Sequence, residues 1–343
     1  MKSICFFNNK GGVGKTTLLC NIASFFAKDL GKRVIVVDCD PQCNSTQLIL
    51  NNDDLMDLYF EGEDKSSITS IVDIVQPIQD GDAAINSTVV PIPSQKNNFF
   101  VDVIPGHPRL SMIEDRLSLS WSDTIGGDIG GLRKSNWVFL LLETIKDRYD
   151  FCFIDLGPSL GSINRSVLLG VEYFLTPMGC DIFSIIGIRN IAHWLARWID
   201  EYIGGVASCN KRHPGKIAEF KLQEELKISQ GFIGYTLQQY ITKSKEGIKR
   251  PTKAFEAILQ QVPREIESSF KGLYAHGLTT ESLKLGDIPQ LYSLIPLSQI
   301  SNVPIFDMSA SNGLVGSQFK QKKDYTALLK QISESIINNI EQG

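Results

Sequence analysis

Short apolar runs recur along the chain, and several of them end in an acidic residue or a glycine-rich turn. The runs at 4–7, 34–37 and 151–154 are continuously apolar, which is typical of parallel strands buried on both faces. Segments such as 15–30 and 186–202 have the apolar spacing expected of helices. Because strands and helices alternate, the sequence predicts an α/β fold with a doubly wound, mostly parallel sheet flanked by helices.

The remaining segments indicate how these elements form a domain. The run at 291–296 predicts the last core strand, and 324–340 predicts the helix that closes the domain. Four glycines fall within 121–131, so we expect a mobile loop there. No internal repeat and no linker rich in proline, glycine or serine divides the chain. We therefore expect one domain over 1–343, enlarged by a partly irregular segment at about 51–136.

A glycine-rich turn joins the first predicted strand to the first predicted helix. Its sequence, residues 10–17, is Lys-Gly-Gly-Val-Gly-Lys-Thr-Thr. In a strand–turn–helix the glycines let successive backbone N–H groups face a phosphate, and the helix N-terminus adds its partial positive charge. Lys15 is placed to reach the β- and γ-phosphates of a nucleotide, and the Thr16 hydroxyl to bind Mg²⁺. The predicted nucleotide-binding residues are Gly11, Gly12, Val13, Gly14, Lys15, Thr16 and Thr17.

Acidic residues follow two of the buried runs. Asp38 and Asp40 come directly after 34–37, and Asp155 follows 151–154. Ligands of open α/β sheets bind outside the carboxyl ends of the strands. We therefore expect these carboxylates to lie beside the glycine-rich turn.

The turn departs from the general phosphate-loop pattern at one position. Asn9 stands where the first glycine of that pattern belongs, and Lys10 adds a second lysine. The octet 10–17 resembles the deviant Walker A motif of the ParA/MinD family of ATPases, and it is closer to ParA and Soj than to MinD. Residues 38–42, Asp-Cys-Asp-Pro-Gln, are similar to the first switch of that family, and 155–161 are similar to its Walker B strand and second switch.

The resemblance implies a catalytic set and two cofactors, ATP and Mg²⁺. Asp40 is implied to position the attacking water, and Lys15 to bind the phosphates. Lys10 is implied to cross a two-fold interface and contact the nucleotide of the partner subunit. The predicted catalytic residues are therefore Lys10, Lys15 and Asp40.

The same resemblance implies which residues bind Mg²⁺ and which residue lies beside the nucleotide base. Asp155 is implied to hold Mg²⁺ through a water, and Asp38 to support it, so the predicted metal residues are Thr16, Asp38 and Asp155. In relatives the proline-marked end of the last core strand borders the base. Pro296 ends the corresponding run here and is a predicted cofactor-binding residue.

Overall charge neither favours nor excludes nucleic acid as a partner. The chain has 34 Lys and Arg against 38 Asp and Glu, a net charge of −4, so DNA binding needs a local basic patch. The densest cluster, 243–253, holds five basic residues and one acid. The resemblance implies non-specific DNA binding by the dimer, and the alternative is a solvated loop that enters a helix. The predicted DNA-binding residues are Lys243, Lys245, Lys249, Arg250 and Lys253, with Arg189 as a further candidate.

Other sequence features concern the compartment. No apolar run approaches the length of about 18 residues that a membrane span needs, and residues 1–3 lead directly into the first strand, which leaves no room for a cleavable signal. The seven cysteines contain no C-x-x-C pair, so we expect buried, reduced thiols rather than disulfides or a metal cluster. We expect a cytoplasmic location, with association with the nucleoid if the protein binds DNA.

Several functions remain open from the sequence. The first is a slow, ParA-like Mg-ATPase that dimerises when it binds ATP, and whose dimer binds DNA. Hydrolysis, stimulated by a partner protein, releases the dimer from DNA. Such a cycle would partition or position DNA or another cargo. The second is a nucleotide-gated regulatory subunit that signals to a partner protein. A MinD-like membrane-associated ATPase is less favoured, because the C-terminal helix ends in acids without late basic residues. A metabolic relative is less favoured because no metal-ligand or substrate motif is present.

Overall fold

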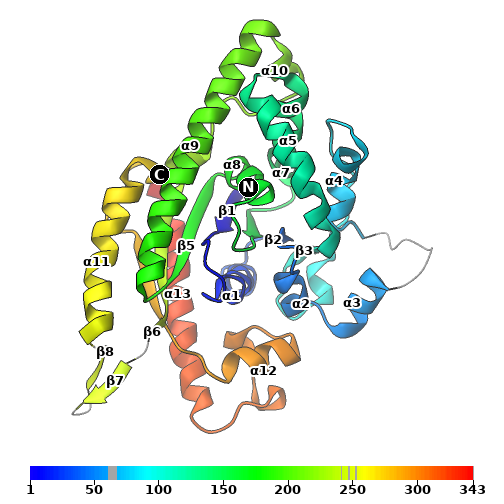
Figure 1. Ribbon diagram of the computed structural model, residues 1–343. Helices are drawn as coiled ribbons and strands as arrows, with labels where there is room; N and C mark the ends of the chain where they lie inside the picture. The colour runs from blue at the N-terminus through cyan, green and yellow to red at the C-terminus, as the bar shows by residue number, and fades with distance from the viewer. Residues whose placement is uncertain (61–67, 241, 246–247, 252, 343) are drawn as a thin grey trace.

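The centre of the molecule is a seven-stranded sheet in the order β3-β2-β4-β1-β5-β6-β9. A computed structural model describes residues 1–60, 68–240, 242–245, 248–251 and 253–342, with the backbone alone over 239–257. All neighbouring strands of this sheet are parallel, which confirms the predicted α/β fold class (Figure 1). The strands are β1 (Lys2–Phe6), β2 (Val34–Asp38), β3 (Asp102–Ile104), β4 (Phe151–Asp155), β5 (Tyr173–Gly179), β6 (Phe232–Tyr240) and β9 (Lys284–Pro289).

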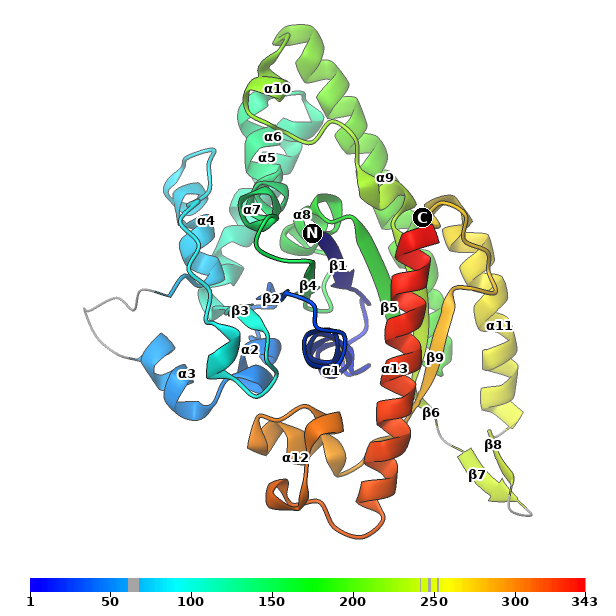
Figure 2. The same ribbon diagram turned by 180° about the vertical axis from the view of Figure 1, so that it is seen from behind.

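Helices cover both faces of the sheet. α1 and α13 contact each other on one face, and α7, α8, α9 and α11 form a row of contacting helices on the other (Figures 1 and 2). The helices on or near the faces are α1 (Lys15–Lys28), α2 (Asn44–Ile49), α3 (Asn52–Tyr59), α4 (Ile71–Asp80), α7 (Trp137–Ile145), α8 (Ser162–Gly170), α9 (Ile182–Arg212), α11 (Lys253–Phe270), α12 (Leu294–Ser301) and α13 (Gln318–Gln342).

The strand register brings the predicted strand-end acids together. β2 and β4 are buried along their whole length, as their continuous apolar runs predict. Their pairing places Asp38 beside Asp155, and β1 pairs Phe6 with Asp155 on the other side of β4. β1 lies between β4 and β5 in the sheet. The glycine-rich turn that follows β1 therefore lies where the strand order reverses, which is the usual ligand site of such sheets.

The mobile loop predicted at 121–131 is wrong, because this stretch is helical. It contains the end of α5 (Glu114–Ile125) and the start of α6 (Ile129–Ser135). A Cβ on Gly131 would lie 2.7 Å from the backbone nitrogen of Thr124, so this glycine permits close helix contact rather than mobility. α5, α6, α10 (Lys216–Glu219) and the C-terminal half of α9 extend from the body as a helical projection (Figures 1 and 2).

The last core strand predicted at 291–296 is also wrong. The strand is β9, at the edge of the sheet, and the predicted run enters α12. β9 escaped prediction because Lys284 and Asp287, which pair at 2.9 Å, interrupt its apolar residues, as charges on edge strands do. Pro296 lies in the first turn of α12, where a missing backbone N–H loses no helical hydrogen bond.

The C-terminal helix packs on the sheet. α13 contacts β9, β6 and α1, and Tyr325, Leu329, Ile332 and Ile336 are buried along one side of it. Its apolar face is therefore covered by protein. In the part of the chain that the structure describes, no helix is long and apolar enough to cross a membrane.

Candidate nucleotide site

The glycine-rich turn has the backbone geometry of an anion-binding loop. Gly12 and Gly14 adopt φ angles of 74° and 76°, a region that only glycine enters without strain. α1 begins at Lys15 directly after Gly14, so its N-terminal N–H groups and helix dipole face the same space. The loop borders a cavity of about 840 Å³ that the residues from Gly11 to Thr17 line on one side.

Lys15 is a buried cation at the floor of this loop. Its side chain is only 7% exposed, and its Nζ donates to the carbonyl oxygen of Lys10 at 3.4 Å. Burial lowers the pKa of Lys15, and the charges of Asp155 and Asp40 act against that shift. A buried ammonium favours a bound anion, because the negative charge of the anion compensates the ammonium for its loss of contact with water.

Hydroxyl and carboxylate oxygens converge at the start of α1. Thr16 donates to Oδ2 of Asp155 at 2.8 Å, and Ser45 donates to the same oxygen. This donor set fits Mg²⁺, which takes oxygen ligands and is held by few carboxylates together with water and phosphate oxygens. Among the described residues no cluster of three His, Cys, Asp or Glu side chains could hold a metal ion alone.

Asp38 does not line the cavity, and its contacts differ from those of a metal ligand. One carboxylate oxygen accepts from the backbone N–H and the hydroxyl of Thr46, at 2.9 and 2.6 Å, and the other accepts from the Asp40 N–H at 3.1 Å. Burial raises its pKa to about 7, and the adjacent Asp155 charge adds to the shift. Burial also raises the pKa of Asp155 to about 6. Asp38 thus anchors residues 40–46, and its supporting role at the metal stays a prediction.

Asp40 belongs to the first switch segment, residues 38–42, and faces the second. It lines the cavity, and its carboxylate accepts from the backbone N–H of Gln42 at 3.0 Å and from the side-chain amide of Asn44 at 3.2 Å. The second switch segment, residues 156–161, approaches it closely, since a Cβ on Gly157 would lie 3.0 Å from Oδ1 of Asp40. Asp40 therefore faces the same cavity as the glycine-rich loop.

Lys10 is the predicted site residue that the structure turns away from this cavity. It is absent from the cavity wall, and its Nζ forms an ion pair with Asp181 at 2.5 Å. Asp181 precedes α9 and accepts from the backbone N–H groups of Phe183 and Ser184. The two lysines of the turn therefore have separate surroundings, one buried at the cavity floor and one at the surface.

A smaller cavity of about 130 Å³ lies on the other side of Gly14 and corrects the prediction for Pro296. Its wall includes Gln238 at the end of β6, Pro289 at the end of β9, and Tyr292, whereas Pro296 lines neither cavity. The proline that ends the last core strand is thus Pro289. Sequence reasoning missed it, together with Gln238 and Ser45. The only sequence signal for Pro289 was its place in a Pro-Gln pair after a short run, and the only one for Ser45 was its position shortly after Asp40.

The basic cluster forms part of a two-stranded ribbon. β7 (Thr242–Lys245) and β8 (Ile248–Pro251) pair antiparallel, with Lys243 opposite Arg250. The side chains of Lys243, Lys245, Lys249, Arg250 and Lys253 lie outside the described residues, so their role in DNA binding stays a prediction. Arg189 is already paired, because its guanidinium makes two hydrogen bonds of 2.7 Å to Glu265.

Comparison with known proteins finds a matching family and similar proteins. The model of a family described as AAA domain matches residues 1–203. The virulence plasmid ParA family protein pGP5-D of Chlamydia psittaci is 31% identical over 196 residues, which are 56% of this chain and 62% of that protein. The sporulation initiation inhibitor protein Soj of Bacillus subtilis is 31% identical over 191 residues, 55% of this chain and 63% of that protein. The chain thus spans less than two thirds of the length of these relatives.

Solved structures share the fold over almost the whole chain. Protein DIP2308 from Corynebacterium diphtheriae is 36% identical, with a TM-score of 0.73 over 88% of this chain and 97% of that one. A plasmid partition protein from Borrelia burgdorferi is 17% identical, with a TM-score of 0.52 over 98% of this chain and 99% of that one. At that identity the second likeness concerns the fold alone.

Proposed function

Because this chain belongs to the ParA family of P-loop ATPases, we propose that it is a slow ATP hydrolase that acts as a dimerisation switch. One observation carries the proposal: the glycine-rich loop, the buried Lys15 and the carboxylate of Asp40 all border one cavity of about 840 Å³. Phosphoryl transfer to water needs positioning and charge neutralisation more than covalent chemistry. These groups provide both.

Residues that line the cavity, and residues hydrogen-bonded to them, divide this work. The backbone from Gly11 to Thr16 and the ammonium of Lys15 bind the phosphates, and Asp40 accepts a hydrogen bond from the attacking water and orients it. Thr16 and Asp155 hold Mg²⁺, which when bound neutralises charge on the phosphate oxygens. Ser45 orients the Asp155 carboxylate through its hydrogen bond.

The smaller cavity is the proposed site of the adenine base. Pro289 and Tyr292 offer apolar and aromatic surface, and Gln238 offers an amide that can both donate and accept. The side chain of Gln238 lies close to the loop, since a Cβ on Gly14 would be 3.2 Å from its Oε1. A nucleotide can therefore reach from this cavity to the phosphate loop across Gly14 and Thr17, which line both cavities.

Self-association is proposed to use the surface around Lys10. Ile182, Phe183 and Ile186 are exposed at the start of α9, directly after Asp181, the ion-pair partner of Lys10. Exposed apolar side chains next to a functional cation are typical of an interface. Two ATP molecules enclosed between subunits would compensate the charge of Lys10 when it leaves Asp181. Because ATP binds the dimer better, it must also favour the dimer.

DNA and a partner protein that stimulates hydrolysis complete the proposed cycle, which takes place in the cytoplasm or on the nucleoid. The β7–β8 ribbon directly follows β6, whose carboxyl end lies at the same edge of the sheet as the phosphate loop (Figure 1). The four basic residues of the ribbon, together with Lys253 at the start of α11, are proposed to contact DNA phosphates. Such binding weakens steeply with salt, because each neutralised phosphate releases counterions.

The deciding experiment measures hydrolysis and DNA binding together. We expect the wild type to hydrolyse ATP slowly and to bind DNA only with ATP, with an affinity that falls as salt rises. Lys15→Ala is expected to lose both activities. The triple variant Lys245→Glu/Lys249→Glu/Arg250→Glu is expected to lose DNA binding while it keeps ATP hydrolysis. DNA binding that ignores the nucleotide, or none at all, would remove the partition-type function.

A nucleotide-gated regulatory subunit is the second candidate, and the helical projection favours it. The projection extends from the body away from the β7–β8 ribbon (Figure 2), and a minimal phosphate-binding fold does not require it. If ATP is hydrolysed but DNA is not bound, this second function becomes the conclusion, with a protein partner as the target.

A further inference from the structure

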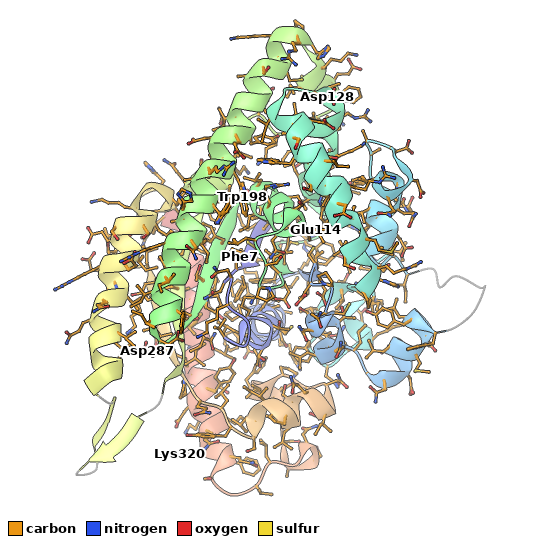
Figure 3. All side chains as sticks on the ribbon, viewed as in Figure 1. Phe7, Glu114, Asp128, Trp198, Asp287 and Lys320 are labelled. Atoms are coloured by element: carbon orange, nitrogen blue, oxygen red, sulfur yellow. The ribbon has the colours of Figure 1, made fainter. Side chains whose placement is uncertain are left out.

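The second switch segment, residues 156–161, is held at its far end by a carboxylate from the helical projection. α8 begins at Ser162, directly after this segment, and the first N–H groups of a helix have no partner within it. Glu114, the first residue of α5, accepts hydrogen bonds from the backbone N–H groups of Ser162 and Ile163, the latter at 3.1 Å. Its negative charge also meets the positive end of the α8 dipole. Figure 3 shows Glu114 where α5 meets the body of the molecule.

The last residue of the segment, Gly161, lies directly against the Glu114 carboxylate. A Cβ on Gly161 would collide with Oε1 of Glu114. The φ of Gly161 is −80°, a value open to any residue, so a side chain here would act by displacing the Glu114 carboxylate and not by straining the backbone. The close approach of the Glu114 carboxylate to this backbone is therefore built into both segments.

From α8 the contacts continue toward the nucleotide site. The side-chain amide of Asn164, in the first turn of α8, donates to the carbonyl oxygens of Gly157 and Ser159, both at 2.7 Å. Gly157 in turn approaches the Asp40 carboxylate, as described above. Hydrogen bonds thus connect Glu114 through the start of α8 to the second switch segment, and Gly157 of that segment lies beside Asp40.

A second set of contacts fastens α8 to the projection. The guanidinium of Arg165 lies over the ring of Trp121 on α5, 4.4 Å from its centroid, and 6.0 Å from the centroid of Trp198 on α9. The indole N–H of Trp121 donates to Glu201 on α9 at 3.0 Å. α8 is therefore held between the two long helices of the projection and cannot shift without disturbing them.

We propose that Glu114 is a positioning residue that couples the second switch segment to the helical projection. By holding the N-terminus of α8, its carboxylate keeps residues 156–161 and Asp40 in the arrangement that hydrolysis needs, and it passes nucleotide-dependent movement of the segment to α5. The part that concerns hydrolysis rests on the proposed ATPase function. The coupling itself concerns only nucleotide binding.

The test compares Glu114→Ala with Glu114→Gln and with Asp115→Ala. Glutamine keeps one acceptor oxygen but loses the charge, and Asp115 is the exposed acid beside Glu114 in the same turn of α5. Hydrogen exchange is measured with and without a non-hydrolysable ATP analogue, and kcat and nucleotide Kd are measured separately. In the wild type, the analogue is expected to slow exchange in both 156–163 and α5.

In Glu114→Ala we expect the analogue to bind with a Kd within about twofold of the wild type but to lose its effect on α5, and kcat to fall about tenfold. The Glu114→Gln variant should give values between those of Glu114→Ala and those of the wild type, and Asp115→Ala should match the wild type. Unchanged protection of α5 in Glu114→Ala would overturn the coupling. A parallel loss of kcat and nucleotide affinity would reduce Glu114 to a merely structural role. Failure of the proposed ATPase function would appear instead as absent hydrolysis in the wild type, and the exchange data would still decide the coupling.

Discussion

Nζ of Lys10 lies 2.5 Å from Oδ2 of Asp181, so the second lysine of the phosphate loop is held by its own chain. Both side chains are 37% exposed, and Asp181 also caps the start of α9. In the proposed cycle Lys10 must leave this partner before it can reach the nucleotide of a second subunit. The ion pair is thus a restraint on dimerisation that ATP has to overcome.

Replacing Asp181 by asparagine is expected to strengthen ATP-dependent self-association. The amide oxygen can still cap α9, but the charge that holds Lys10 is lost. Exposed ion pairs contribute about 0–1 kcal/mol, so the gain should not exceed about fivefold per subunit. Analytical ultracentrifugation with a non-hydrolysable analogue measures it. Glu219→Gln, which breaks a similarly exposed pair with Lys216, is the control and should change nothing. Weaker association of Asp181→Asn would contradict the restraint.

The stability of the nucleotide-free protein is expected to fall as pH rises from about 4 to about 7. An unfolded aspartate titrates near about 3.9, whereas burial raises the pKa of Asp38 to about 7 and that of Asp155 to about 6. The folded state therefore binds more protons across this interval, and its stability is lost as they leave. Asp38→Asn should reduce this fall by an amount on the order of 2 kcal/mol.

Urea unfolding between pH 4.5 and 7.5, without Mg²⁺ or nucleotide, measures that effect. Asp53→Asn, which replaces an exposed acid on α3, should keep the slope of the wild type. A variant at Asp38 whose stability still declines as steeply as that of the wild type would show that its carboxyl is not the group that titrates.

Mg²⁺ is expected to tighten ATP binding through Thr16 and Asp155. Thr16→Ala and Asp155→Asn should each reduce this tightening by about 10- to 100-fold, and Ser45→Ala by less, because Ser45 acts through Asp155. Calorimetry of ATP binding with and without Mg²⁺ separates the metal effect from the nucleotide effect. Ser111→Ala, which removes an exposed hydroxyl far along the chain, is the control. Equal losses with and without Mg²⁺ would argue against a metal role.

Two adjacent glycines of α9 are expected to respond in opposite ways to alanine. A Cβ on Gly205 would collide with the carbonyl oxygen of Thr124, whereas a Cβ on Gly204 would meet nothing within 4 Å. Gly205→Ala should therefore destabilise the protein by roughly 1–3 kcal/mol. Gly204→Ala should stabilise it by about 0.5–1 kcal/mol, since alanine favours helix. Thermal unfolding of both variants compares them directly, and similar shifts would contradict the close packing of α5 on α9.

The sequence by itself determined those structural features that depend only on residues close together along the chain. The run 10–17 specifies its own turn and helix start, and the apolar runs of β1, β2 and β4 specify buried parallel strands. Since the carboxyl ends of such strands meet at one edge, Asp38, Asp40 and Asp155 could be placed near the loop before their contacts were known. The physical reason is that short-range geometry and burial of apolar surface act within each segment.

Only the tertiary structure decided which distant groups meet. Glu114 reaches α8 across 48 positions of sequence, and Lys10 reaches Asp181 across 171. No local pattern encodes such pairs, because they depend on how helices pack on the sheet. The same holds for Gly131, which lies in a stretch that the sequence predicts as a mobile loop but permits close helix contact in the fold. Pro289 replaced Pro296 for a related reason: charges on an edge strand hide its periodicity, and only pairing with β6 reveals it.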